Sequence, residues 1–154
     1  MKHLLAIVLF LATVTSANAQ TLGPEVVHDG GFDTGSGWTL GYGWQVTPGP
    51  TPETGLAFHN EGASSALSQP LVVPMTAGAV YRVTYTVTNA ATSSNPLHWL
   101  RLRGSTTAIT PLSYGAGQFS FDVTAPANVH TISVHASYGC SCVLDNVSIR
   151  EIQP

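Results

Sequence analysis

The sequence is poor in charge. Only 8% of its 154 residues are Asp, Glu, Lys or Arg, whereas about 25% is usual for a globular domain. Lysine occurs once, near the N-terminus, and the other basic residues are Arg82, Arg101, Arg103 and Arg150. Neutralising nucleic-acid phosphates or an anionic membrane surface requires clustered Lys and Arg. The composition therefore disfavours both of these partners and favours a neutral ligand.

A hydrophobic run long enough to cross a membrane is also missing. A spanning helix needs about 20 apolar residues, and the N-terminal apolar run covers only Leu4–Leu11. It follows Lys2 and precedes Ala17-Asn18-Ala19, which has the small-x-small form of a cleavage site. These parts predict a signal peptide over residues 1–19 and a secreted, extracellular or periplasmic protein. A membrane anchor is the alternative, and membrane insertion is disfavoured by the length of the run.

Cysteine is scarce, and only Ser141 separates Cys140 from Cys142. Secretion permits a disulfide. However, Cα atoms at i and i+2 of a strand lie about 7 Å apart, at the limit for a bridge. A local bridge would need a bent backbone, which Tyr138-Gly139 could supply. A strained bridge, two thiols and an intermolecular link all stay open, whereas the spacing required for zinc is absent.

The sequence does contain many segments in which apolar and polar residues alternate, separated by turn residues. The clearest runs over 80–89 and places Tyr81, Val83, Tyr85 and Val87 on one face. Further strands are predicted over 97–103, 118–124, 129–136 and 143–149, with shorter ones over 56–59 and 65–73. No convincing helix interrupts them. The pattern predicts an all-β, jelly-roll β-sandwich formed by one domain over residues 20–154.

The outward positions of the middle and late strands form the candidate binding surface. Alternation places Leu100, Leu102, Ile132 and Val134 inward. The opposite positions hold Trp99, Arg101, Arg103, Asp122, Thr131, Ser133 and His135. If these strands share a sheet, they present one surface of aromatic and polar side chains.

Such a surface is suited to sugars. Sugar rings have apolar faces that stack on aromatic rings, and their hydroxyl groups bond to planar polar side chains such as Arg. An aromatic side chain on the solvent face of a strand also tends to mark an interaction site. The structural alternative is that the 90–96 loop covers Trp99 and that Arg101 pairs with Asp122.

Signatures of catalysis are lacking. There is no Gly-x-Ser-x-Gly elbow, phosphate-binding loop or zinc motif. A glycosidase needs two carboxylates across a cleft, and Asp122 has no evident acidic partner on the candidate surface. The sequence therefore predicts a protein that is not an enzyme. A small hydrolase, with a second acid facing Asp122, is the alternative.

Two short motifs flank the alternating segments. Asp29-Gly30-Gly31-Phe32-Asp33 and Gly37-Trp38 lie near the start, and Val143-Leu144-Asp145-Asn146-Val147-Ser148-Ile149 lies near the end. This layout resembles carbohydrate-binding modules with a galactose-binding-like β-sandwich, including the cellulose-binding family 4/9 of bacterial endoglucanases. Similar modules occur in bacteriophage virion proteins. The resemblance covers about residues 25–149 and implies binding of a neutral polysaccharide or a cell-surface glycan.

The resemblance also implies individual binding residues. Arg101 and Gly104 match an arginine three residues before a glycine at the end of a middle strand. Tyr42 and Tyr114 stand close to the two loop aromatics, and Thr131 and His135 match two polar positions on a late strand. The relatives carry glutamine there, so a histidine changes the donor pattern. With the outward pattern, the predicted glycan-binding set is Tyr42, Trp99, Arg101, Arg103, Tyr114, Thr131 and His135.

A structural calcium ion is a further implication of the resemblance. Its matching ligands are the carbonyls of Gly31 and Gly55 and the side chain of Asp145, with Asp33 as a further candidate. Calcium takes several oxygen ligands of these kinds. The alternative is that Asp145 only accepts backbone N–H bonds. Trp38 and Trp44 match packing aromatics of the family, and we expect them in the core.

A second class of function also fits the sequence. The chain could be a structural or assembly subunit, associated with an envelope or a virion, that uses the same fold for protein contacts. Its weakly charged, threonine-rich faces would then be subunit interfaces and the protein would self-associate. The predicted signal peptide argues against a virion part that is made in the cytoplasm.

Overall fold

The computed structural model describes residues 20–154, apart from 49–54, 60–63, 89–96, 106, 112 and 138–140. The predicted signal peptide over 1–19 and Cys140 therefore lie outside the described residues. Cys142 is buried, and the three alternatives for the cysteines, a bridge, two thiols and an intermolecular link, all stay open. Every regular element of the described residues is a strand. None of their segments forms a helix long and apolar enough to cross a membrane.

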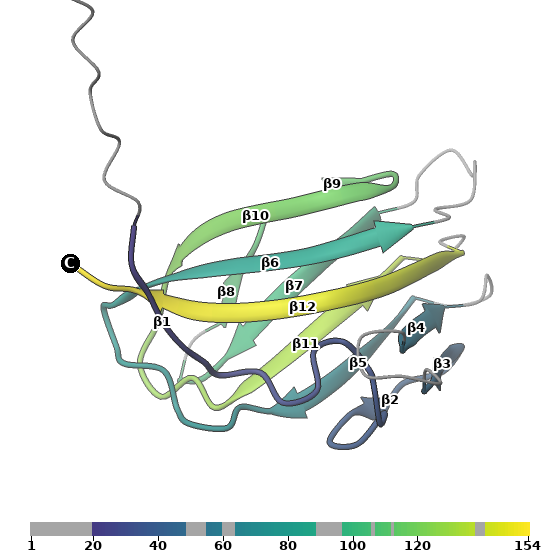
Figure 1. The fold of residues 1–154 in the computed structure, drawn as a ribbon, viewed down its shortest axis with the longest axis horizontal. Coiled ribbons are helices and arrows are strands. Elements are labelled where there is room, and N and C mark those ends of the chain that lie inside the picture. Colours follow the sequence, from purple (N-terminus) through teal and green to yellow (C-terminus); the bar gives the residue numbers. More distant parts are fainter. Residues whose placement is uncertain are drawn as a thin grey trace, which may run out of the picture.

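The strands form two antiparallel six-stranded sheets, one behind the other in Figure 1. Sheet A consists of β10 (Gly117–Thr124), β6 (Val80–Thr88), β12 (Cys142–Ile152), β4 (Leu56–His59) and β3 (Trp44–Thr47), in that spatial order, with β1 (Leu22–Glu25) also on β12. Sheet B consists of β2 (Thr39–Leu40), β5 (Ser65–Pro70), β11 (Thr131–Ala136), β7 (Leu97–Arg103) and β8 (Thr107–Ile109), with β9 (Ser113–Tyr114) also on β7. The predicted all-β sandwich is confirmed.

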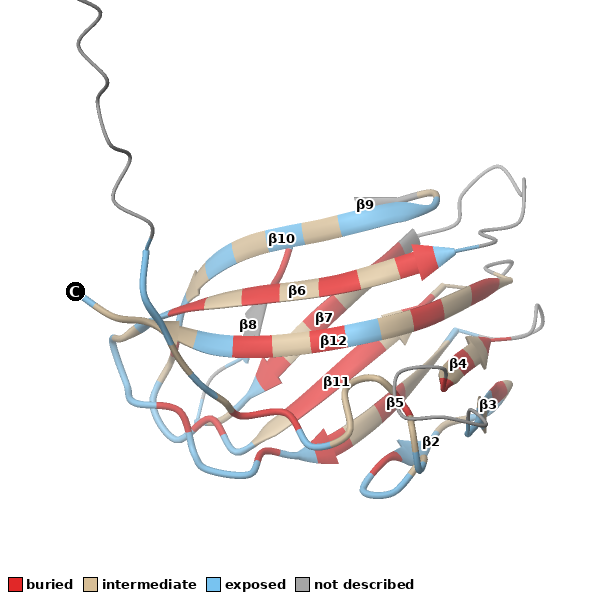
Figure 2. Cartoon of the chain, viewed as in Figure 1, coloured by how far each residue is buried: buried red, intermediate tan, exposed pale blue. Residues whose placement is uncertain are grey.

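The core lies between the two sheets. Buried and half-buried residues alternate along β6, as the banding in Figure 2 shows. Tyr81, Val83, Tyr85 and Val87 point inward from sheet A, and Leu100, Leu102, Ile132 and Val134 point inward from sheet B. The period-two pattern therefore predicted the inward residues of both sheets correctly, because successive strand side chains point to opposite faces.

The two motifs of the sequence meet at β12. The backbone N–H of Val147 donates to the carbonyl of Gly30 at 2.9 Å. A side chain at Gly30 would collide with the carbonyl of Val147, so glycine is required for this approach. Phe32 packs against Trp38 with ring centroids 5.0 Å apart, and the indole N–H of Trp38 donates to the carbonyl of Asp29. These contacts tie the first loop to the last strand.

The prediction that Asp122 shares a surface with Trp99 is wrong. Asp122 lies on β10, which pairs with β6 in sheet A, and its register partner is Arg82. Both carboxylate oxygens of Asp122 accept hydrogen bonds of 2.9 Å from the Arg82 guanidinium. The proposed pairing of Arg101 with Asp122 is therefore also excluded. Alternation tells which residues of a strand share a face, but it does not tell which sheet the strand joins.

The register of β11 can be tested by replacing two neighbouring residues. Ile132→Ala should lower the free energy of unfolding by about 2–5 kcal/mol, because it leaves a cavity in the core. Thr131→Ala, on the outward face, should cost less than about 1 kcal/mol. Urea unfolding of both variants measures this difference, and equal losses would contradict the register.

Candidate functional site

The pairing of β7 with β11 builds the candidate site. In its register Trp99 lies opposite His135, Arg101 opposite Ser133, and Arg103 opposite Thr131. Residues that face each other across an antiparallel pair project to the same side of the sheet and contact one another. On β11 these partners alternate with Ile132 and Val134, which belong to the core between the sheets. Thr131 and His135 are half-buried, and Ser133 is buried. The predicted outward surface on β7 and β11 is thus a real face of sheet B.

Trp99 and His135 form the centre of this face. Their rings stack with centroids 5.1 Å apart and planes 9° from parallel. Ser133, which is 1% exposed, lies 3.1 Å from Nε2 of His135 through its hydroxyl oxygen. This hydrogen bond fixes the imidazole, and the imidazole supports one face of the indole. The Trp99 ring is half-buried and held in one orientation before any ligand arrives.

Two arginines extend from the same strand. The guanidinium carbon of Arg101 lies 5.6 Å from the ring centroid of Trp99, within the range of a cation–π contact. Arg103 is exposed, two residues further along β7. Thr131 is half-buried opposite Arg103. An aromatic ring, two planar cations and a hydroxyl group therefore project from two adjacent strands.

His135 is electrostatically coupled to these arginines. Its pKa is lowered to about 4, firstly by burial and secondly by the positive charges of Arg101 and Arg103. The imidazole is therefore neutral at physiological pH, in keeping with its stacking and its bond to Ser133. The sequence predicts that His135 bonds to sugar hydroxyl groups. In the structure Nε2 already bonds to Ser133, so the main effect of His135 is to position Trp99.

The remaining predicted glycan contacts lie further from this centre. Tyr42 is 78% exposed in the turn between β2 and β3. The N–H of the preceding Gly41 donates to the carbonyl of Ala66, which itself pairs with His135. Gly41 is therefore level with Trp99 along the strands but lies at the β2 edge of sheet B, three strand spacings or about 14 Å away. Tyr42 follows Gly41 in the turn. The side chain of Tyr114 lies outside the described residues, and its backbone pairs with Leu97 on β7.

Gly104, the other half of the arginine motif, has a structural role. A side chain at Gly104 would collide with the backbone of Ala127 and Asn128. The loop after β7 can pack against the turn before β11 only if this position is glycine. Ser133 was predicted on the outward face with His135, two residues away, but it was not among the predicted glycan-binding residues. That spacing was the available signal.

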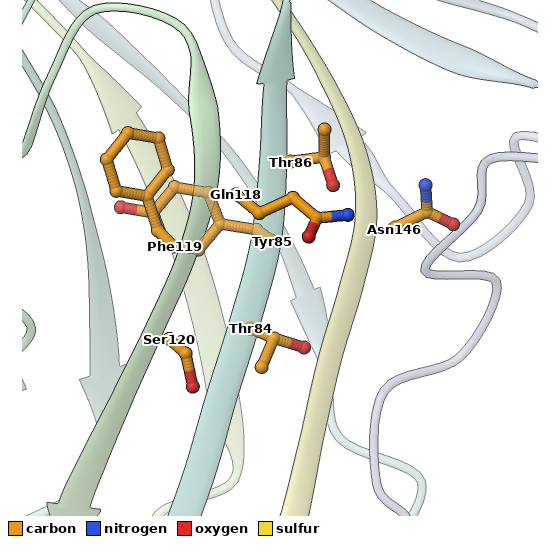
Figure 3. A pocket seen from close by; sticks show the side chains of 7 residues that line it. All are labelled: Thr84, Tyr85, Thr86, Gln118, Phe119, Ser120 and Asn146. Carbon is orange, nitrogen blue, oxygen red and sulfur yellow. The ribbon is translucent and has the colours of Figure 1, made fainter.

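A second candidate is a groove of about 460 Å³ on sheet A. It is lined by Thr84, Tyr85, Thr86, Gln118, Phe119, Ser120 and Asn146. Figure 3 shows the polar ends of Gln118 and Asn146 near Thr86, whereas the rings of Tyr85 and Phe119 turn away from them. The lining side chains bear no charge, and Tyr85 is buried in the core. This groove offers hydrogen bonds but no aromatic platform for a sugar ring.

The predicted calcium ligands lie on the first loop, on the residue before β4 and on β12. A side chain at Gly55 would collide with the carbonyl of Phe32, and one at Gly31 would contact the carboxylate of Asp33 at 3.4 Å. The pKa of Asp145 is raised, firstly by burial of its carboxyl group and also by the negative charge of the nearby Asp33. Two neighbouring carboxylates beside loop carbonyls form an oxygen-rich set that fits calcium.

The set contains few side-chain ligands. Among the described residues no three His, Cys, Asp or Glu side chains gather around one point. An ion here would therefore depend on backbone carbonyls in addition to Asp33 and Asp145. Oδ1 of Asp145 also accepts the N–H of Asn146 at 2.6 Å. Asp145 therefore does accept a backbone N–H bond, as in the alternative role. Its Oδ2 remains for other partners.

Asp122 and Glu151, two acids of sheet A, each bond to a neighbouring side chain. Asp122 and Glu151 both line a shallow groove near the chain ends. However, the hydrogen bonds from Arg82 hold the pKa of Asp122 below its usual value. The acid of a glycosidase needs a raised pKa to remain protonated. Glu151 instead accepts a hydrogen bond from the hydroxyl of Tyr81.

Comparison with known proteins supplies structural neighbours only. No protein-family model and no curated protein sequence matches the chain. A solved structure titled Family 16 Carbohydrate Binding Module-2 matches with a TM-score of 0.62 and 11% identity, over 80% of this chain and 98% of that chain. The CBM22-1 xylan-binding domain from Paenibacillus barcinonensis Xyn10C matches with a TM-score of 0.57 and 14% identity, over 90% and 99%. The chain shares the β-sandwich fold of these two carbohydrate-binding modules.

This fold also occurs within larger proteins. The enzymatically active domain of the bacteriophage CBA120 tailspike protein 4 matches with a TM-score of 0.58 and 15% identity. The match covers 83% of this chain but only 21% of that chain. The fold resemblance that the sequence indicated is therefore confirmed. The specific relation to family 4/9 stays a prediction.

The electrostatic coupling of His135 predicts its titration. In an NMR titration its imidazole should change protonation near pH 4, well below the usual value of about 6.5. Because the folded pKa is depressed, the unfolded chain binds the proton first, so His135 should destabilise the fold as pH falls from about 6.5 to 4. Arg101→Met should raise the pKa of His135 by removing a neighbouring cation. Titration at the usual value would contradict the described packing.

Proposed function

We propose that this chain is a secreted, non-catalytic glycan-binding module and that its ligand lies on the outward face of sheet B. The observation that carries the proposal is the stack of Trp99 on His135 beside Arg101. Aromatic rings that are held rigidly bind with little loss of conformational entropy. The solved neighbours that are carbohydrate-binding modules support the same class of ligand.

In this proposal some residues contact the ligand and others hold the indole of Trp99 in place. Trp99 would contact the apolar face of a sugar ring, and Arg101, Arg103 and Thr131 would bond to polar groups of the sugar. His135 and Ser133 hold the indole. Tyr42, at the far edge, would contact a further sugar of a long chain. The low overall charge favours a neutral glycan. Whether the protein prefers neutral or charged glycans depends, however, on the charges of the proposed binding face, which are those of Arg101 and Arg103.

Calcium is proposed as a structural ion and takes no part in ligand chemistry. Asp33 and Asp145, with the carbonyls of Gly31 and Gly55, would hold it. The positive ion would offset the repulsion between the carboxylates of Asp33 and Asp145. It would also fix the first loop to β12.

Replacement of Trp99 tests the location of the site. On a glycan array Trp99→Ala should lose binding to the glycan class that the unchanged protein binds. Affinity should fall about 30-fold or more, since a central aromatic anchor contributes about 2 kcal/mol or more. The matched control is Gln118→Ala, an exposed residue of the groove on sheet A, which should bind as before. Loss of binding in the control alone would move the site to sheet A.

Replacement of Asp145 tests the calcium proposal. Without calcium, the raised pKa of Asp145 means that its charge destabilises the fold as pH rises through that pKa. Asp145→Asn should then be at least as stable as the unchanged protein in chelator at pH 7. With calcium at 100 times its dissociation constant, the unchanged protein should gain about 2.7 kcal/mol. The variant should gain much less, and equal responses in thermal unfolding would contradict the proposal.

A further inference from the structure

Positive and negative charges are distributed unequally between the two sheets. The carboxylates of the described residues lie on sheet A or on the segment that joins β1 to β2: Glu25, Asp29, Asp33, Asp122, Asp145 and Glu151. The described part of sheet B has no carboxylate. Its charged side chains are Arg101 and Arg103, two residues apart on β7 and both on the outward face. The binding face is therefore positive, although the whole chain is acidic.

The arginines of the two sheets also differ in their partners. On sheet A, Arg82 pairs with Asp122 and Arg150 pairs with Glu25. Among the described residues no carboxylate pairs with Arg101 or Arg103. Moreover, Nε of Arg101 is buried without an acceptor in the described part of the chain. A buried donor without an acceptor is costly, so Arg101 is suited to a ligand that brings one.

The positive charges of Arg101 and Arg103 act on His135. Each contributes to lowering the pKa of His135, which shows that both project positive potential across the stack of Trp99 and His135. Protonation of His135 is thereby opposed, so the imidazole stays neutral and adds no charge of its own. A ligand anion placed here would meet two cations and no anionic side chain of the described residues.

The geometry points to an acidic glycan, one whose sugars carry carboxylate or sulfate groups, as the ligand of this face. The inference rests on the proposed glycan-binding function and names its ligand class. Trp99 would contact the sugar ring, and the guanidinium groups of Arg101 and Arg103 would bond to its anionic oxygens. Planar guanidinium groups bond to carboxylates through two parallel hydrogen bonds. This replaces the expectation of a neutral glycan, which rested on composition averaged over the whole chain.

Matched polymer pairs separate charge from sugar identity. Binding of the full secreted protein is measured by isothermal titration to polygalacturonate and to its methyl-esterified form, and to dextran sulfate and to dextran. The first pair tests carboxylates, and the second tests sulfates. We expect the charged member of at least one pair to bind about tenfold or more tightly than its neutral partner at low salt. That preference should shrink at higher ionic strength, because counterions screen exposed charges.

Variants of single arginines test which sheet causes the preference for the charged polymer. Arg103→Gln, at an exposed position, should reduce the preference for the charged polymer about fivefold or more, and Arg101→Gln should do the same. The matched control is Arg82→Gln, which removes the same charge from sheet A and breaks an exposed ion pair of small worth. It should leave the preference unchanged. Thermal unfolding of each variant shows whether it is folded.

The outcomes separate this inference from the proposed function. Preference for a charged polymer that disappears in Arg103→Gln and persists in Arg82→Gln supports both. Equal binding of charged and neutral polymers, abolished by Trp99→Ala, overturns the acidic ligand and leaves the glycan-binding site in place. An equal loss in Arg82→Gln also overturns it, because the attraction is then general. Binding to no polymer of either pair and to no glycan of an array overturns both.

Discussion

The candidate site depends on the register between β7 and β11. That register places Trp99 opposite His135 and Arg101 opposite Ser133, and every contact of the proposed surface follows from it. A shift of one residue would send Trp99 into the core and bring Leu100 to the surface. The buried neighbours Leu100, Leu102, Ile132 and Val134 prevent such a shift, since each would lose its place between the sheets. Core packing thus determines the geometry of the outer face.

The two sheets have different tasks in this account. Sheet A carries both ion pairs, of which Arg82–Asp122 joins β6 to β10 and Arg150–Glu25 joins β12 to β1. The carboxylates of Asp33 and Asp145 lie near the first loop. Sheet B carries the aromatic stack and two arginines that pair with no carboxylate of the described residues. A positive surface is thereby kept apart from the acids that would neutralise it. This separation explains how a chain with net negative charge can offer a positive binding face.

Much of the fold was predictable because burial imposes alternation. The inward residues of β6, β7 and β11 follow directly from the period of two, as do the outward positions of Trp99, Arg101 and His135. The placement of Asp122 was not predictable in this way. Its strand alternates just as clearly, but sheet membership is decided by long-range pairing with β6. Likewise, the bond of Ser133 to His135 depends on side-chain rotamers that a sequence pattern does not encode.

Indole signals in the ¹⁵N spectrum of the protein test the central claim most directly. The chain has three tryptophans. Trp38 and Trp44 are buried in the core, whereas Trp99 is half-buried on the outer face of sheet B. When a glycan that binds the protein is titrated, the Trp99 indole signal should move and the other two should stay in place. If Trp99 stays in place while the amide signals of Gln118 and Asn146 move, the ligand lies in the groove on sheet A and the account is wrong.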